Sequence, residues 1–506
     1  MTTFYEALES EQKQAKTLTE NGAIAYQTAG KEILDFNFAI TQMRQMKEKQ
    51  IQDMYAKVYF ENPLIAIKYL FYVGDIREGL GERKIFKSCM NWLCVHKSKI
   101  ATWIVELIPE YSRWDILVQL IEHKEVETRV TRIIEEQLNK DLDAKNKKES
   151  VSLLAKWLPS ENASSPKTVS LAKHVRKNLG LTPKVYRKIL SSLRAYLNVV
   201  EIKMSDKRWS DIEYETVPSM ANLKYKEAFE RNDYDRRTAY LNSLAKGKTK
   251  INATVSTPCD IVANYSHVTW DIRPGHYNET LEQMWKSLPN KLVNNVLVIR
   301  DGSGSMAAAG YGASMPLVVS TAMAIYMAQH NTGGWKNKFI TFSNKPKVIS
   351  IDNCESLRDC LEICAANTDW SNTDIYKTMM LVLKTAKKQK MSQQDMPKTV
   401  LIISDMQFDG RGFNFNKTLF ENISDEFKQA GYLLPRICFW NVAANTRNTI
   451  PMQQNELGLC LISGYSVTLV NMVMSGELDP YKALLEQLNS ERYKPVEEAY
   501  KAAMDR

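Results

Sequence analysis

Two short apolar runs in the C-terminal part of this chain each end in an aspartate, NVLVIRD (295–301) and KTVLIISD (398–405). Helical patterns and further apolar runs alternate after the first of them, at 316–330, 338–343, 373–389, 416–431, 436–442 and 457–464. This alternating order of strands and helices predicts a parallel sheet covered by helices on both faces. Because ligands bind at the carboxyl ends of the strands in open α/β sheets, the two aspartates are candidate ligand groups.

The first run continues into Asp301-Gly302-Ser303-Gly304-Ser305, in which every second residue carries an oxygen. The intervening glycines let the backbone coil tightly, so the alternate oxygens can turn toward one point. A hard divalent cation, Mg²⁺ above all, takes oxygen ligands in octahedral geometry and keeps several waters. The sequence therefore predicts a site for Mg²⁺ or another divalent cation at this strand end.

The sequence DGSGS resembles the D-x-S-x-S metal-ion-dependent adhesion motif of von Willebrand factor A domains. In that family, a threonine from a later loop and an aspartate at a later strand end complete the site. The resemblance carries these positions to Thr373 in SNTDIY and Asp405 in IISD. It implies that the hydroxyls of Ser303, Ser305 and Thr373 bind the metal directly, and that Asp301 and Asp405 often act through water.

Arg300 departs from the A-domain pattern, because an apolar residue usually precedes the first aspartate of the motif. Its side chain could crowd the site or reach over it. The motif D-x-S-x-S also occurs by chance in other proteins, and some A-domains keep it without binding a metal.

From about residue 30 to 245, apolar residues recur at three- and four-residue spacing, with breaks at glycine or proline. This pattern predicts stacked helical pairs, as in an α-solenoid, although we find no repeat of fixed period. The predicted fold is multi-domain, with an α-helical HEAT-like solenoid or ring followed by an α/β Rossmann-like A domain. The predicted divisions are 1–290 for the helical domain with its connector, 291–475 for the A domain and 476–506 for a C-terminal helix.

Several short stretches resemble the TROVE module of the Ro 60-kDa autoantigen family, and the closest resemblance is to domain-of-unknown-function family 2828. The stretches that resemble TROVE are YVGDIREGLGERKIF (72–86), YSRWDILVQL (111–120), LAKWLPS (154–160) and VPSMANLKYKEAF (217–229). Three further stretches, ISDMQFD (403–409), FWNV (439–442) and SGYS (463–466), resemble family 2828. The resemblance implies a ring of helical repeats closed by an A domain. It also implies that the ring binds small structured RNAs on its outer surface and single-stranded ends of defective RNAs through its hole.

The net charge of +9 lies entirely within residues 1–300, because residues 301–506 hold 21 basic and 21 acidic residues. The segment 167–194 contains no acidic residue, and its basic residues recur at i, i+3 and i+4 spacing on two consecutive helices. Basic faces of this kind can neutralise phosphates, and His174 and Tyr186 could stack on bases. The predicted RNA-binding residues are Lys167, Lys173, His174, Arg176, Lys177, Lys184, Arg187 and Lys188, with Arg194 in the same basic segment. The alternative is a basic face that only contacts solvent.

Nothing in the sequence indicates an enzyme, since the nucleotide-binding and nucleophile motifs that we sought do not occur. A charged corner at 75–83 is interpreted as an ion-pair network and not as an RNA contact. No membrane-length apolar run and no secretion signal are visible, so we expect a cytoplasmic protein that is monomeric and has no membrane partner.

Three functions remain open from the sequence. The first is a non-catalytic RNA-binding protein. The second is a metal-dependent adaptor whose A domain binds an acidic protein partner. A metal-dependent hydrolase is the third.

Overall fold

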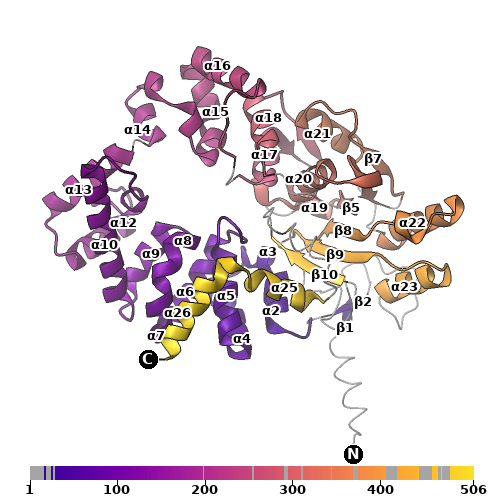
Figure 1. Ribbon diagram of the computed structural model, residues 1–506, viewed down its shortest axis with the longest axis horizontal. Helices are drawn as coiled ribbons and strands as arrows, with labels where there is room; N and C mark the ends of the chain where they lie inside the picture. Colours follow the sequence, from indigo (N-terminus) through magenta and orange to yellow (C-terminus); the bar gives the residue numbers. More distant parts are fainter. Residues whose placement is uncertain are drawn as a thin grey trace, which may run out of the picture. The chain divides into compact units, whose positions relative to one another are not determined.

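The computed structural model describes most of the chain (Figure 1). The described residues are 16–18, 24–26, 29–197, 199–253, 256–269, 271–289, 295–308, 312–343, 345–368, 374–405, 419–443, 459–464, 469 and 479–505. Contacts divide the chain into two compact units. The α/β unit is Met1–Lys47, Pro218–Lys224 and Leu241–Gln487, and the helical unit is Glu48–Val217, Tyr225–Tyr240 and Leu488–Arg506. This grouping differs from the division predicted from the sequence, because the first segment belongs with the sheet and the last with the helices.

The helical unit confirms the prediction of a helical N-terminal region. Its α-helices are α4 (Glu48–Glu61), α5 (Pro63–Gly74), α6 (Arg83–His96), α7 (Ser98–Ile104), α8 (Ile108–Tyr111), α9 (Trp114–Gln119), α10 (Glu127–Asn146), α11 (Leu154–Trp157), α12 (Pro166–Asn178), α13 (Pro183–Leu197), α14 (Val200–Ser205) and α26 (Lys494–Met504), while α15 (Ser219–Asn232) and α16 (Tyr234–Ala245) include residues of both units. The helices break where proline and glycine predicted. At one such break the Asn62 side chain accepts a hydrogen bond from the N–H of Ile65 at 3.1 Å, and Pro63 opens α5. A solenoid arrangement stays a prediction.

A buried acid, Asp75, ties the C-terminal segment to the first helices of this unit. The guanidinium of Arg492 donates two hydrogen bonds to its carboxylate, at 2.9 and 3.2 Å, and the Tyr493 hydroxyl donates a third at 3.2 Å. The same guanidinium lies 4.3 Å from the centre of the Tyr111 ring. The charged corner is therefore an ion-pair network, as the sequence indicated. Its main cation, however, comes from 417 residues further along the chain.

The α/β unit contains a six-stranded sheet in the order β10-β9-β8-β5-β6-β7. The strands are β5 (Val296–Asp301), β6 (Lys338–Phe342), β7 (Val348–Ser350), β8 (Thr399–Ser404), β9 (Arg436–Asn441) and β10 (Leu459–Ser463). All neighbours pair in parallel except β6 and β7, which are antiparallel. The prediction of a wholly parallel sheet is therefore wrong at this edge, where a three-residue strand too short to show a pattern folds back on β6.

Helices cover both faces of the central strands, because every residue of β5, β8 and β9 is buried. The helix α20 (Pro316–Gln329) is buried along nearly its whole length and packs on β5, β6 and β8. The other helices of this unit are α2 (Glu32–Phe38), α3 (Ile40–Met43), α17 (Pro258–Tyr265), α18 (Glu279–Lys286), α19 (Ser305–Ala308), α21 (Leu357–Ala366), α22 (Ile375–Gln389), α23 (Leu419–Gln429) and α25 (Pro480–Leu488). Within the described part of the chain, no helix has the length and apolar character needed to cross a bilayer.

The segment 246–290, interpreted from the sequence as a connector with loops, is more regular than expected. It contains α17, the antiparallel strands β3 (Ser266–Val268) and β4 (Ile272–Pro274), and α18. A capping box starts α17, in which Thr257 and Asp260 bond each other's backbone N–H groups at 2.8 and 3.1 Å. Elements of three to eight residues are too short to give a clear hydrophobic period, so the sequence did not show them.

The N-terminal segment packs against the carboxyl ends of β9 and β10. The Thr41 hydroxyl donates a hydrogen bond to the carbonyl of Ala443 at 2.8 Å, and the Asn441 side chain donates one to the carbonyl of Phe38 at 3.1 Å. Helix α2 contacts β10 directly. These contacts explain why the first described helices belong to the α/β unit.

We predict that Arg492→Ala lowers the free energy of unfolding of the helical unit by about 3–5 kcal/mol, because Asp75 would remain buried without its cation. Urea denaturation followed by circular dichroism measures this. The matched control is Arg77→Ala. The ion pair between Arg77 and Glu110 is more than half exposed, so this substitution should lower the free energy of unfolding by at most about 1 kcal/mol. Equal losses in the two variants would contradict the prediction.

Candidate functional site

Two aspartates at adjoining strand ends form the centre of the candidate site. β5 lies between β6 and β8, so the chain leaves β5 toward one side of the sheet and later returns on its other side. The carboxyl ends of β5 and β8 meet at this reversal, where open α/β sheets bind ligands. Asp301 is the last residue of β5, and Asp405 directly follows β8. Strand order therefore brings together two residues that are about a hundred positions apart.

The Asp301 carboxylate is fully buried and accepts hydrogen bonds from two serines. The Ser404 hydroxyl donates to Oδ2 at 2.6 Å, and the N–H of Ser303 donates to Oδ1 at 2.9 Å. The hydroxyl of Ser320 in α20 donates to the backbone carbonyl of Asp301 at 2.8 Å. Neither Ser404 nor Ser320 is among the sequence-predicted site residues. Only the position of Ser404 beside Asp405, at the end of an apolar run, hints at its role.

This environment makes Asp301 hard to ionise, and its pKa is raised to about 7. Burial is the largest cause, and repulsion by the Asp405 carboxylate adds to it. The hydrogen bonds from Ser404 and Ser303 favour the ionised form and act in the opposite direction. Two desolvated carboxylates thus lie close enough to repel each other.

The predicted hydroxyl ligands lie beside this pair. Ser303 is buried and Ser305 is exposed, and their Oγ atoms are 3.1 Å apart. The D-x-S-x-S spacing therefore turns both hydroxyls toward the same place. Thr373, the fifth predicted ligand, lies outside the described residues. The other four gather around the carboxyl ends of β5 and β8.

Arg300 neither reaches over the site nor crowds its open side. Its side chain is buried, and Nε donates to the hydroxyl of Thr321 in α20 at 3.0 Å. The guanidinium lies beneath the motif loop, where a Cβ on Gly302 would be 3.4 Å from Nη1. This is an ordinary contact distance, so the buried arginine does not by itself require glycine at this position.

The residues present fit a hard divalent cation. Every candidate donor is an oxygen, and a cation would relieve the repulsion between the two carboxylates. Among the described residues, no group of three or more His, Cys, Asp or Glu side chains is placed to hold a metal ion. A cation here would depend on hydroxyls and water for its remaining ligands. Metal binding at this site stays a prediction.

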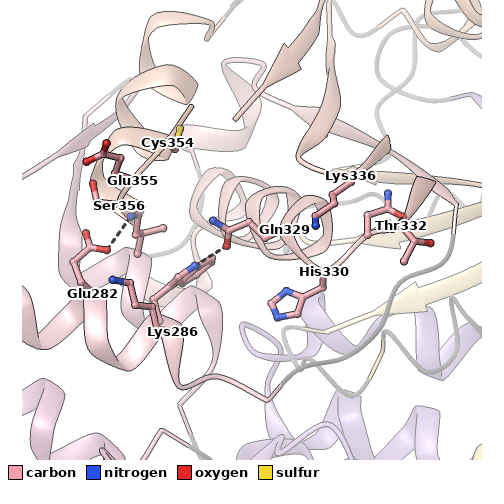
Figure 2. Close-up of a pocket in the computed structure, with 12 residues that line it drawn as sticks. Glu282, Lys286, Gln329, His330, Thr332, Lys336, Cys354, Glu355 and Ser356 are labelled. Atoms are coloured by element: carbon pink, nitrogen blue, oxygen red, sulfur yellow. Dashed lines mark hydrogen bonds between the residues drawn. The ribbon is translucent and has the colours of Figure 1, made fainter. Parts of the chain in front are cut away.

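A separate cavity of about 490 Å³ lies at the opposite, amino-terminal edge of the sheet (Figure 2). Its buried acid, Glu282, already accepts hydrogen bonds from two backbone N–H groups at the start of α21 (2.8 and 3.2 Å) and from the Tyr265 hydroxyl (2.9 Å). The indole N–H of Trp285 donates to Gln329 at 2.8 Å. The Glu282 carboxylate is thus bonded to groups inside the protein and is not placed to bind a cation in the cavity. The sequence analysis did not identify it, because its lining comes from three separated segments.

The predicted RNA-binding segment forms α12 and α13, and most of its cations are exposed. Side chains that are exposed and form no ion pair within the described residues are Lys167, Lys173, Lys177, Lys184, Arg187 and Lys188. They repeat the predicted spacing on both helices. This set, the basic surface, could contact an anionic partner without first breaking an internal ion pair.

The remaining predicted positions in this segment are used inside the fold. Arg176 pairs with Glu161 at 2.7 Å and also bonds the Leu181 carbonyl, which fixes the turn between α12 and α13. Arg194 donates to the carbonyls of two residues near α11 and to a serine hydroxyl. Tyr186 is fully buried, so the prediction that it stacks on bases is wrong. Its hydroxyl donates to the Pro159 carbonyl at 2.9 Å.

His174 remains exposed, but it is not free. Its Nε2 lies 2.8 Å from Glu127, which also accepts a hydrogen bond from Asn178. These contacts lower the pKa of Glu127, with the Asn178 hydrogen bond as the largest cause. A carboxylate therefore borders the basic surface on this side. Base stacking on His174 would require this contact to open.

We predict that the stability of the metal-free protein falls as the pH rises from about 4 to about 7 and then levels off, and that Asp301→Asn removes part of this fall. The pKa of Asp301 is about 7 in the folded chain and about 4 in the unfolded chain. The folded state therefore holds an extra proton between these pH values, and deprotonation weakens folding by about 1.4 kcal/mol per pH unit. Urea denaturation in EDTA at about pH 5 and about pH 8 measures the difference between the variants. Parallel pH profiles for wild type and Asp301→Asn would contradict the prediction.

Comparisons with known proteins place the chain among uncharacterised relatives. A family model described as domain of unknown function DUF2828 matches residues 19–108 and 117–297, and a second, DUF7788, matches residues 295–505. An uncharacterised protein of Acanthamoeba polyphaga mimivirus is 30% identical over 521 residues, covering 95% of this chain and 88% of that protein. A crystal structure of the Deinococcus radiodurans Ro (RSR) protein matches with a TM-score of 0.40 and 12% identity over 86% of this chain and 92% of that one. That TM-score is too low to support an argument about fold or function. The DUF2828 model and the mimivirus relative confirm the resemblance to family 2828 that the sequence motifs indicated. The chain belongs to the DUF2828 family.

Proposed function

We propose that this protein is a non-catalytic RNA-binding protein whose helical unit contacts RNA phosphates through the basic surface. The expected ligand is a small structured or misfolded non-coding RNA, bound by a monomer in the cytoplasm. The short motifs that resemble Ro proteins support this proposal, as does the restriction of the net positive charge to residues 1–300.

The observation that carries the proposal is the set of six exposed cations on α12 and α13. A solvated helix face usually alternates acids and bases, which then form ion pairs at i, i+4 spacing. The segment 167–194 has no acid of its own, so its lysines repel one another unless an external anion neutralises them. The fold already uses Arg176 and Arg194, and the free cations are those at the surface. An extended polyanion such as RNA satisfies this arrangement better than a single small anion.

We predict that reversing four of these charges, by Lys173→Glu, Lys177→Glu, Arg187→Glu and Lys188→Glu, abolishes RNA binding. Each neutralised phosphate releases counterions, so the slope of log K against log salt should fall by about 0.7–0.9 for each phosphate that the variant no longer neutralises. Fluorescence anisotropy with a labelled structured RNA at several salt concentrations measures both effects.

The matched control reverses the charge of four exposed lysines on and directly after α22 in the α/β unit, by substitution with glutamate. These are Lys384, Lys387, Lys388 and Lys390. This control has the same total change of charge, so it separates a local contact from a general electrostatic effect. Unchanged RNA affinity in the α12–α13 variant would exclude the basic surface as the binding site. An equal loss of RNA affinity in the control would show that the change of net charge, and not a local contact, explains the weaker binding.

A second candidate function is supported by the buried pair Asp301 and Asp405. We infer a divalent-cation site of the A-domain type, in which the cation lies among Asp301, Ser303, Ser305, Asp405 and Thr373. When bound, the cation would supply a positive charge at the open edge of the sheet. An aspartate or glutamate from a protein partner could complete its coordination, so the α/β unit would act as an adaptor. The same unit could instead close a helical ring, as the Ro resemblance suggests.

We predict that Mg²⁺ raises the thermal midpoint of the wild-type protein and that Asp301→Asn and Asp405→Asn lose this response. A ligand that binds only the folded state adds about 2.7 kcal/mol of stability at a concentration a hundred times its dissociation constant. Differential scanning calorimetry with Mg²⁺ and with EDTA measures the shift. The control Asp352→Asn removes an exposed acid near the end of β7 and should respond like wild type. Equal Mg²⁺ responses in all four proteins would exclude this site.

A further inference from the structure

An aromatic cluster lies at the surface of the helical unit, where α4 and α6 end side by side. Phe60, near the end of α4, is 70% exposed. The Tyr59 and Trp92 rings stand behind it, with centroids 5.9 and 6.3 Å from the Phe60 centroid. His96 extends the cluster, at 5.1 Å from Trp92. Single exposed apolar residues are common on protein surfaces, but here the exposed ring belongs to a cluster of four rings.

A cation is fixed over this cluster. The Lys97 ammonium lies 5.1 Å from the centre of the Tyr59 ring and 5.2 Å from that of Phe60. Its backbone is held at the corner between α6 and α7, where its N–H bonds Leu93 and its carbonyl accepts from Ala101. Among the described residues Lys97 forms no ion pair, so its charge is open to an external anion. Cation–π contact holds the amine close to the rings.

The neighbouring charges favour an anionic partner. Lys57, one turn before Phe60, and Lys99, two residues after Lys97, are exposed and form no ion pair within the described part of the chain. The acid beside them, Glu61, has an interaction of its own. The cluster therefore combines an open aromatic face with unpaired positive charge. Proteins that bind single-stranded nucleic acids use this combination, stacking bases on rings while lysines contact the backbone.

We propose that Phe60 and Lys97 form a stacking platform for a single-stranded segment of the RNA, separate from the basic surface of α12 and α13. The inference rests on the proposed RNA-binding function and adds a second, chemically different contact. The basic surface contacts phosphates in any RNA form. The platform requires an unpaired base, because bases inside a duplex do not present their faces.

The test compares binding of a labelled oligouridylate and a labelled RNA duplex to the full-length protein by fluorescence anisotropy. Phe60→Ala should weaken oligouridylate binding roughly 5- to 100-fold, as the removal of one stacking ring does, and leave duplex binding unchanged. Phe60→Trp should retain oligouridylate binding, since it keeps an aromatic face. Lys97→Gln should lower the salt slope for the oligouridylate by about 0.7.

The matched control is Tyr234→Ala, which removes another exposed aromatic ring of the helical unit (66% exposed) that no cation contacts among the described residues. It should bind both RNAs as wild type does. If Phe60→Ala binds the oligouridylate as tightly as wild type, the proposed stacking platform is contradicted, whereas the proposal for the basic surface is unaffected. If the wild-type protein binds neither RNA, the proposed function fails and the platform fails with it. A loss that affects both RNAs equally would also overturn the stacking role.

Discussion

The burial of two carboxylates at adjoining strand ends is the constraint on which the α/β unit depends. Asp301 has no exposed surface, and repulsion from Asp405 adds to the cost of ionising it. Serine hydroxyl and backbone N–H groups offset only part of that cost. A fold built only for stability would place apolar residues at these positions, as it does at most other positions of β5 and β8. The cation proposed for this site would relieve that cost.

Charge has opposite roles in the two units. In the α/β unit, two desolvated acids meet at one edge of the sheet, and burial opposes the ionisation of Asp301. In the helical unit, the buried acid Asp75 already has its cation, Arg492, and the excess positive charge lies at the surface. An unpaired buried charge costs much more than an unpaired exposed one. The cation proposed for the acidic pair would therefore offset a large cost, whereas the partner proposed for the basic surface would be bound through several weak, salt-sensitive contacts.

The basic segment shows how one run of sequence can serve both folding and binding. Its arginines at 176 and 194 bond backbone carbonyls and are largely withdrawn from solvent, whereas its lysines remain exposed. A guanidinium offers several fixed donors, which suits the two positions that the fold uses. Arg187 stays exposed with the lysines, so the place of each residue on its helix, and not its type alone, decides which cations bond inside the fold. Phe60 and Lys97 add an aromatic contact that the lysines alone cannot supply. Together the two surfaces would bind phosphates and unpaired bases by different interactions.

Local patterns in the amino-acid sequence were enough to predict the helical region, the apolar strands, the D-x-S-x-S spacing and the acid-free basic segment. These depend on periodicity and on neighbours a few residues apart. The folded structure was needed to show that Ser404 bonds Asp301, that Arg492 neutralises Asp75, and that Tyr186 is buried. It also showed that β7 runs antiparallel and that the N-terminal helices pack on β10. Each of these is a contact between distant segments, and its partner depends on strand order and helix packing, which no local pattern encodes.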